Sequence, residues 1–422
     1  MNKMTNRSVE FVVQAGRTLL EAGAEVYRVE DTVQKMGDAL GIRRLESYVT
    51  PAGVFISYID SAGAPSTYFR KAAKRGVNLS KISAINNLSR QVAQKEVDLE
   101  EAFSILGQIE SAAPMYSTLI KISCGAVNAA AITVINGGNW QDFWIAFMVT
   151  YLVYLLIDAT RILAIPFMRE LLIGSVGTGL VLATRTLIDF DINPVIVGVL
   201  LSAIPGAFMV NSVRDAIAGD LISGAIRGFE AVGLMMALFG GAGITIGIVG
   251  LEYLPEPVEP VMPLITLGFF VSALFNIYNL APKRTIFGAG LVGLLSSFVL
   301  YWTMQSPFPI ILGMLWGAMA ASLASEILAR IYRVPVTVFI IGGFVPLLPG
   351  VWFFRATQFL FTGNYPLFFE PLLMGVTGIM AVGVGVAVVT AVVRHWKRRH
   401  KDILFDGRFF RRMFKDNGQA KM

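Results

Sequence analysis

Histidine and cysteine are scarce in this sequence, and their scarcity limits the chemistry that the chain can perform. Of its 422 residues, 2 are histidine (His395 and His400) and 1 is cysteine (Cys124). These residues cannot form a Ser–His catalytic site, a multi-thiolate metal site or a chain of histidines that relays protons. We therefore expect no metal ion and no cofactor, and proton transfer within an apolar region must use Asp or Glu.

Carboxylates within apolar stretches are consequently the candidates for carrying a proton. An ionisable side chain in a membrane span is costly, so it is a functional candidate by default. Four acidic residues lie in or beside such stretches: Asp158, Asp215, Asp220 and Glu326. Asp158 lies three residues before Arg161, and Glu326 lies four before Arg330. Both spacings also allow ordinary helix ion pairs, which is the more common role for the arginines.

A dense polar segment combines one cation with two acids. It reads Asn211-Ser212-Val213-Arg214-Asp215, followed by Gly219-Asp220. These side chains suit a zwitterionic solute, although an interfacial loop with a satisfied Arg–Asp pair is an equally good interpretation. Asn128 and Asn276, in two other apolar segments, could hydrogen-bond a substrate or hold helices together, and the second role is the more common.

Two stretches match each other at a separation of 144 residues. The first reads Gly198…Pro205-Gly206…Gly219-Asp220, and the second reads Gly342…Pro349-Gly350…Gly363-Asn364. A Pro-Gly pair inside an apolar helix frees backbone groups, which are tolerated at depth only where they face protein or a wet cavity. We predict two broken helices that flank a polar substrate, with Arg214 or Arg355 attracting its carboxylate. Simple packing kinks are the alternative.

The composition requires most of the elements that position these residues to lie in a membrane. The chain is 55% hydrophobic and 15% charged, with a mean hydropathy of +0.63, whereas soluble domains carry about 25% charged residues. A spanning helix needs about 20 mostly apolar residues. Ten segments qualify: 119–135, 143–163, 171–188, 194–213, 229–251, 262–281, 286–304, 307–328, 335–352 and 371–393. Five spans in each half make the matching stretches run in opposite senses, which predicts an inverted repeat.

A small soluble domain precedes these spans. We expect no signal peptide, because the first 28 residues lack an unbroken apolar core. Periodicity predicts an α+β domain over residues 1–118, with helices at 8–21, 24–40, 78–94 and 99–111 and strands at 45–50, 53–59 and 67–70. The remaining units are repeats at 119–251 and 262–393, an external acidic linker at 252–261 and a basic tail at 394–422. Glu25 follows a glycine at a helix start, where a capped, solvated carboxylate is more common than a catalytic acid.

Basic residues orient the predicted bundle. With residue 1 in the cytoplasm, eight Lys or Arg fall in cytoplasmic connections and two fall outside. The cytoplasmic set is Arg161, Arg169, Arg214, Arg227, Lys283, Arg284, Arg330 and Arg333, and the external set is Arg185 and Arg355. We expect a multi-pass inner-membrane protein with both termini cytoplasmic. The net charge of +6 comes mostly from the tail, so we expect lipid, a small-molecule substrate and protons as partners, possible self-association and no nucleic acid.

The sequence resembles the threonine/serine exporter family in its fused two-half form. Three segments carry the resemblance: Ala22-Gly23-Ala24-Glu25-Val26-Tyr27-Arg28-Val29-Glu30-Asp31-Thr32, Ile204–Gly224 with its Pro-Gly and Gly-Asp, and Pro335–Gly350 with its Pro-Leu-Leu-Pro-Gly. The resemblance implies efflux of small hydroxy amino acids, driven by the proton gradient. Related two-subunit members resemble dicarboxylate exporters, so export of a succinate-like dicarboxylate is the alternative.

Two further alternatives belong to other functional classes. A membrane-anchored hydrolase would need an active site in the N-terminal domain, but residues 1–118 contain no Cys or His and no G-x-S-x-G motif. A passive channel would show a flux that is insensitive to replacement of the four acids. The residues therefore favour a transporter over an enzyme.

Overall fold

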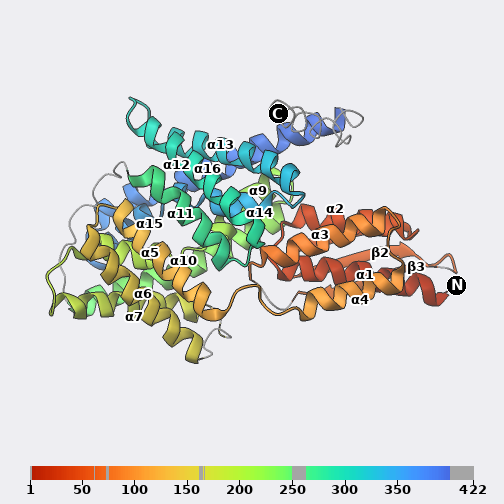
Figure 1. The fold of residues 1–422 in the computed structure, drawn as a ribbon, viewed down its shortest axis with the longest axis horizontal. Coiled ribbons are helices and arrows are strands. Elements are labelled where there is room, and N and C mark those ends of the chain that lie inside the picture. The colour runs from red at the N-terminus through yellow and green to blue at the C-terminus, as the bar shows by residue number, and fades with distance from the viewer. Residues whose placement is uncertain are drawn as a thin grey trace, which may run out of the picture.

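The computed structural model describes residues 2–60, 62–72, 76–160, 165, 167–249 and 263–399. The predicted external linker at 252–261, Arg161 and the tail from residue 400 lie outside these ranges. Figure 1 shows an N-terminal α+β domain at one end and a large group of helices at the other.

The N-terminal domain packs four helices with a small antiparallel sheet. Its elements are α1 (Asn2–Glu21), α2 (Val26–Ala39), β1 (Arg43–Thr50), β2 (Gly53–Ile59), β3 (Pro65–Lys71), α3 (Leu79–Ala93) and α4 (Leu99–Ser111). The strands lie in the order β1-β2-β3, and Val54 pairs with Val49 on one side and Arg70 on the other. Alternate apolar side chains of β2, such as Val54 and Ile56, are buried beneath α1 and α2, as the alternating pattern predicts.

Fourteen further elements form the helical part among the described residues. The first group is α5 (Thr118–Ile135), α6 (Trp140–Thr160), α7 (Met168–Arg185), α8 (Ile192–Leu201), α9 (Gly206–Ile217) and α10 (Leu221–Val249). The second group is α11 (Pro263–Tyr278), η2 (Lys283–Thr285), α12 (Ile286–Met304), α13 (Ile310–Tyr332), α14 (Thr337–Gly343), η3 (Val345–Leu347), α15 (Gly350–Phe361) and α16 (Tyr365–Arg399).

The helical part is a multi-pass membrane domain. Six helices are long and apolar enough to cross a membrane, and counting two bent helix pairs as one span each raises the number to eight. α11 has only 16 residues, and α7 carries Arg169, Glu170 and Arg185, so ten spans remain a prediction. Large apolar side chains face outward on these helices, for example Phe229 at 80% and Ile248 at 81% exposure on α10. Lipid contact accounts for apolar exposure on this scale.

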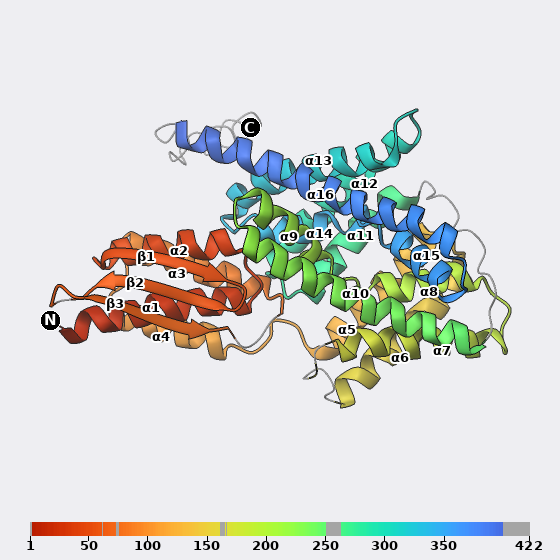
Figure 2. The ribbon, with the colours of Figure 1, turned by 180° about the vertical axis from the view of Figure 1, so that it is seen from behind.

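The two groups of helices pack in the same pattern. In the first group, α5 contacts α6 and α8, and α7 contacts α10; in the second, α11 contacts α12 and α14, and α13 contacts α16. Between the groups, α5 contacts α11, α9 contacts α16 and α10 contacts α15. Figure 2 shows α9 on the side of the bundle that faces the N-terminal domain, and α10 extending from there toward α15. Corresponding helices of the two groups therefore have corresponding neighbours.

Candidate functional site

Both predicted helix interruptions are present, and they share one local geometry. The chain bends by 56° between α8 and α9 and by 49° before α15. Pro205 has φ −77° and ψ 51°, and Pro349 has φ −79° and ψ 43°. In each case the glycine N–H donates to the carbonyl two residues back, at 2.8 Å for Gly206 and 2.9 Å for Gly350. These are inverse γ-turns, whose central φ is one that proline adopts easily.

The two interruptions contact each other reciprocally. A Cβ atom on Gly206 would come within 3.0 Å of Leu348, and a Cβ atom on Gly350 would come within 3.0 Å of Ile204 and Leu201. Ile204 and Leu348 occupy the same position, two residues before the glycine, in their respective halves. Apolar side chains therefore fill the contact between the two interruptions, and a methyl group added to either glycine would have to displace them.

The first segment of each broken helix also packs tightly within its own group. A Cβ atom on Gly198 of α8 would come within 3.0 Å of the Ala129 carbonyl of α5. The corresponding atom on Gly342 of α14 would come within 3.0 Å of the Ser272 carbonyl and the Asn276 amide of α11. Thus Gly198 and Gly342 mark close approaches to backbone atoms at matching places in the two groups.

A buried ion pair joins the N-terminal domain to the first broken helix. The Glu25 carboxylate, at 0% exposure, accepts hydrogen bonds from Arg214 Nη1 at 2.8 Å and Arg28 Nε at 2.9 Å. It also accepts from Thr337 Oγ1 of α14 at 3.0 Å. The Tyr27 hydroxyl lies 3.2 Å from Arg214 Nη2. One carboxylate of the N-terminal domain therefore contacts both groups of membrane helices.

The expectation that Glu25 is a capped, solvated helix start is wrong. Glu25 does occupy the N-cap position of α2, but its side chain makes no capping hydrogen bond and points into the bundle. Its partner Arg214 is 189 residues away in sequence, so local spacing could not reveal the pair. The sequence indicates only that charged residues are dense around Glu25 and around Arg214, and that both segments lie beside apolar stretches.

A second ion pair lies beside the first. Arg227 Nε of α10 lies 3.3 Å from Asp215 Oδ2, and Arg227 Nη2 donates to the Ala24 carbonyl at 2.7 Å. Both Asp215 oxygens are buried, and neither accepts a hydrogen bond among the described residues. Arg227, predicted only as a charge in a cytoplasmic connection, is instead buried at the domain junction.

The other predicted site residues are spread over the bundle. Asp220 caps α10 through the Ser223 N–H at 3.3 Å, and Arg355 lies over the Trp352 ring at 5.2 Å. Glu326 is buried and lies 4.0 Å from Arg330, whereas Asp158 is exposed at the end of α6. In the described part of the chain, Asp158, Asp220 and Arg355 form no hydrogen bond or ion pair with Glu25.

Two predicted asparagines occupy the first helix of each group. Asn128 and Asn276 are buried, at 3% and 0% exposure. The Asn276 amide donates to the Ser272 carbonyl at 3.1 Å, whereas neither Oδ1 atom accepts a hydrogen bond among the described residues. The Asn276 amide therefore bonds within its own helix in this conformation. The side-chain oxygens of Asn128 and Asn276 provide one buried hydrogen-bond acceptor in each group of helices.

Several helix ends converge on the N-terminal domain. The Leu79 and Ser80 N–H groups of α3 donate to the carbonyls of Asn279 and Leu280, at 3.1 and 3.0 Å, and the Tyr116 hydroxyl donates to Ala281 at 2.9 Å. The end of α9, the start of α14 and the end of α16 also reach this domain. The ends of α9, α11 and α16 and the start of α14 therefore lie on the same side of the bundle, beside the N-terminal domain.

The electrostatics of Glu25 lead to a test by pH. Burial raises the pKa of Glu25, but the Arg28 and Arg214 guanidiniums outweigh it and hold the pKa well below its ordinary 4.5. A depressed pKa in the folded state stabilises the protein above the unfolded pKa, and this contribution is lost as pH falls. We expect the melting-temperature difference between wild type and Glu25→Gln to be constant from about pH 8 to about pH 5 and to narrow below about pH 4. A difference that disappears between pH 7 and 6 would contradict this assignment.

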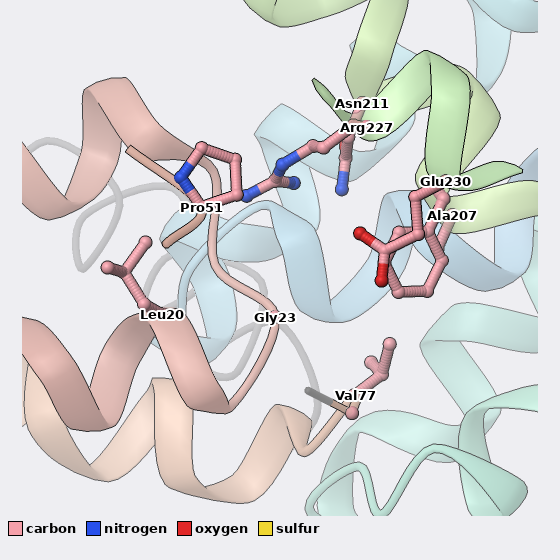
Figure 3. A pocket seen from close by; sticks show the side chains of 10 residues that line it. Leu20, Gly23, Pro51, Val77, Ala207, Asn211, Arg227 and Glu230 are labelled. Atoms are coloured by element: carbon pink, nitrogen blue, oxygen red, sulfur yellow. The ribbon is translucent and has the colours of Figure 1, made fainter. Parts of the chain in front are cut away.

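A cavity opens between the N-terminal domain and the first broken helix. Figure 3 shows the Glu230 carboxylate pointing into it and the Arg227 guanidinium at its edge beside Pro51. Loops and helix ends of the N-terminal domain form one wall, and the first two turns of α9 with the second and third turns of α10 form the other. The lining residues are Leu20, Gly23, Pro51, Gly76, Val77, Ala207, Phe208, Asn211, Arg227 and Glu230.

Comparison with known proteins identifies the family. Residues 10–249 match one model of the threonine/serine exporter family, and residues 264–392 match a second model described as threonine/serine exporter. The chain belongs to the threonine/serine exporter family. This confirms the resemblance drawn from the sequence and makes the protein a membrane exporter by family.

Individual relatives agree with this family. The threonine/serine exporter of Corynebacterium glutamicum is 22% identical over 91% of this chain and 79% of its own length. The "Probable threonine/serine exporter" of Mycobacterium tuberculosis is 20% identical over 85% of this chain and 71% of its own. The "Probable succinate transporter subunit YjjP" of Escherichia coli is 25% identical over 57% of this chain and 94% of its own. No solved structure gives a significant match.

Segments that carry the family resemblance contact one another in this exporter. Glu25, from the first segment, accepts a hydrogen bond from Arg214 of the second, and the Ala24 carbonyl accepts one from Arg227, three residues beyond the second segment. Pro205-Gly206 and Pro349-Gly350, from the other two, form the reciprocal contact. Among the described residues, no group of three or more His, Cys, Asp or Glu could hold a metal ion.

Proposed function

We propose that the protein is a secondary transporter that exports threonine- or serine-like amino acids across the inner membrane, with both termini in the cytoplasm. The reciprocal contact between the two broken helices carries the proposal. Together with the matching helix neighbours, it supports an inverted repeat whose halves rock about a central site. Pro205, Gly206, Pro349 and Gly350 would lie at that site, with Asn128 and Asn276 nearby.

The N-terminal domain would act as a cytoplasmic gate. Glu25 binds Arg214 of the first half and Thr337 of the second, at 2.8 and 3.0 Å. Relative motion of the halves would stretch at least one of these hydrogen bonds. The domain would therefore stabilise the conformation described here. Binding of substrate or protons would shift the equilibrium toward a conformation in which these hydrogen bonds are broken.

Asp215 is the carboxylate best suited to carry the coupled proton. It is buried, its oxygens accept no hydrogen bond among the described residues, and one cation, Arg227, lies at 3.3 Å. Asp220 caps a helix, Glu326 has Arg330 nearby, and Asp158 is exposed. We expect Asp215→Asn to retain threonine counterflow but to lose its stimulation by a pH gradient. Asp158→Asn should keep both. Equal pH-gradient stimulation in Asp215→Asn and wild type would reject the assignment.

Transport in proteoliposomes tests the function itself. Purified full-length protein should exchange labelled threonine for internal unlabelled threonine, and serine should compete. Empty liposomes and protein heated above its melting temperature provide the background. Absence of exchange for threonine and serine under every imposed gradient would reject the proposal.

Export of a dicarboxylate is the second candidate. It is favoured by the likeness to a protein named as a succinate transporter subunit and by the arginines at the domain junction. Succinate that competes for transport while threonine does not would select it.

A further inference from the structure

Several buried hydroxyl groups of the membrane helices have no hydrogen-bond partner among the described residues. A serine or threonine in a helix commonly donates to the carbonyl four residues before it. Ser175, Thr184 and Thr303 do so here, each at 2.8 Å. Four other side chains make no such bond, although each residue is at most 1% exposed: Thr150, Thr178, Ser297 and Ser325. Within an apolar bundle, each of these unpartnered hydroxyls is costly.

The four hydroxyls occupy equivalent positions in the two groups of helices. Thr150 of α6 and Ser297 of α12 are 147 residues apart, and Thr178 of α7 and Ser325 of α13 are also 147 residues apart. α6 and α12 are the second α-helices of their groups, and α7 and α13 are the third. Ser223 of α10 also lacks a partner, but the second group has no equivalent hydroxyl. The same two helices of each group therefore carry an unpartnered hydroxyl.

An unpartnered amide oxygen extends this match to the first helix of each group. Asn128 of α5 and Asn276 of α11 are 148 residues apart, and neither Oδ1 atom accepts a hydrogen bond among the described residues. The Asn276 amide nitrogen already donates to the Ser272 carbonyl at 3.1 Å, so its oxygen must point the other way. Three successive α-helices in each group thus present one buried polar atom without a partner.

The first of these sets lies at the depth expected of a site in the middle of a membrane. Asn128, Thr150 and Thr178 each come ten residues after the first residue of their helix. At about 1.5 Å per residue, this distance is about 15 Å, which is half of a hydrocarbon core about 30 Å thick. Transporters built from inverted repeats commonly bind their solute at this depth.

The chemistry of these atoms selects the kind of solute. A hydroxyl group can donate or accept a hydrogen bond, whereas an asparagine oxygen can only accept one. The missing partner must therefore bring N–H or O–H donors to Asn128 and Asn276. An α-amino acid carries three N–H donors on its ammonium group, and threonine and serine add a hydroxyl group. A dicarboxylate such as succinate offers only acceptors at neutral pH and would face the two asparagine oxygens with like partial charges.

We propose that these two equivalent sets bind the ammonium and hydroxyl groups of a small amino acid as it crosses the membrane. The first set is Asn128, Thr150 and Thr178, and the second is Asn276, Ser297 and Ser325. The inference rests on the proposed export function and adds the substrate class. The conformation described here encloses all six side chains, so they receive the solute when the two groups of helices move relative to each other.

Removal of single hydroxyls tests the proposal through transport and stability together. Thr178→Val replaces the hydroxyl by a methyl group of similar size. Because no hydrogen bond is lost in the described conformation, the melting temperature should stay the same or rise. The threonine concentration that half-saturates counterflow in proteoliposomes should rise by about 5- to 10-fold, as expected for one lost hydrogen bond to the solute. Ser325→Ala should have the same two effects.

Thr303→Val provides the matched control. Thr303 is also buried, at 2% exposure on α12, but its hydroxyl donates to the Val299 carbonyl of its own helix. This variant should half-saturate at the wild-type threonine concentration. Unchanged half-saturation in both Thr178→Val and Ser325→Ala would overturn the two sets, while threonine exchange by the wild type would still uphold the export function.

Three other results would also reject the inference. A melting temperature lower than that of Thr303→Val would make the removed hydroxyls structural. Slower exchange with unchanged half-saturation would show that they bind water on the pathway and not the solute. Wild-type protein that exchanges succinate but neither threonine nor serine would overturn the inference together with the proposed amino-acid export.

Discussion

Glu25→Gln is expected to lower the free energy of unfolding by about 3–5 kcal/mol, the usual cost of removing one partner of a buried ion pair. Glutamine keeps the shape of the side chain but leaves Arg214, at 4% exposure, without its carboxylate. Arg28 and Thr337 also lose the charged carboxylate and keep at most one neutral amide oxygen as an acceptor. Because these contacts join the two parts of the molecule, thermal unfolding in detergent should show a lower melting temperature and earlier separation of the N-terminal domain.

A surface ion pair of the same domain provides the control. Arg7 and Glu100 pair with side chains that are 47% and 63% exposed, and such pairs contribute about 0.2–1 kcal/mol. Glu100→Gln should therefore barely shift the melting temperature. The double variant Glu25→Gln/Arg214→Gln should lose less than the sum of the single variants, because the pair is coupled. Similar shifts for Glu25→Gln and Glu100→Gln would contradict the buried network.

Gly198→Ala and Gly342→Ala are expected to reduce both stability and transport strongly. The added methyl group would meet the Ala129 carbonyl in the first half and the Ser272 carbonyl in the second, each within 3.0 Å. Backbone atoms cannot rotate away as a side-chain end can, so two helices must separate. Overpacking of this kind costs about 1–3 kcal/mol, and sometimes more.

Gly240→Ala is the matched control for this pair. Gly240 also lies within an apolar helix, α10, and a Cβ atom there has no neighbour within 4 Å. We expect its melting temperature and threonine counterflow to equal those of the wild type. If Gly198→Ala and Gly342→Ala behaved like Gly240→Ala in both measurements, the close helix contacts would be wrong.

Features with a local cause could be predicted from the sequence. Pro205-Gly206 and Pro349-Gly350 must interrupt a helix wherever they lie, because proline removes a donor and glycine tolerates close approach. The alternation of apolar and polar residues predicted a strand at 53–59, and β2 begins at Gly53 and ends at Ile59. The residues of each segment are therefore sufficient to predict these two interruptions and this strand.

Features that depend on distant partners could not be predicted in this way. Glu25 and Arg214 each resemble an ordinary surface charge until folding brings them to 2.8 Å. Arg227 and Glu230 looked like part of a cytoplasmic connection and a span, and their common cavity depends on the docking of the N-terminal domain. Spacing along one helix reports which face a residue occupies, but not what lies opposite that face.

The double contact of Glu25 has a consequence for how such a protein could be divided. A chain cut between α10 and α11 would turn the Thr337 hydrogen bond, the α3–α11 contacts and the packing of α9 on α16 into contacts between two polypeptides. The soluble domain, retained by the first polypeptide, would then recognise the second. In a relative made of two such polypeptides, the carboxylate at the position of Glu25 would hold the two subunits together as well as keep the proposed cytoplasmic gate closed.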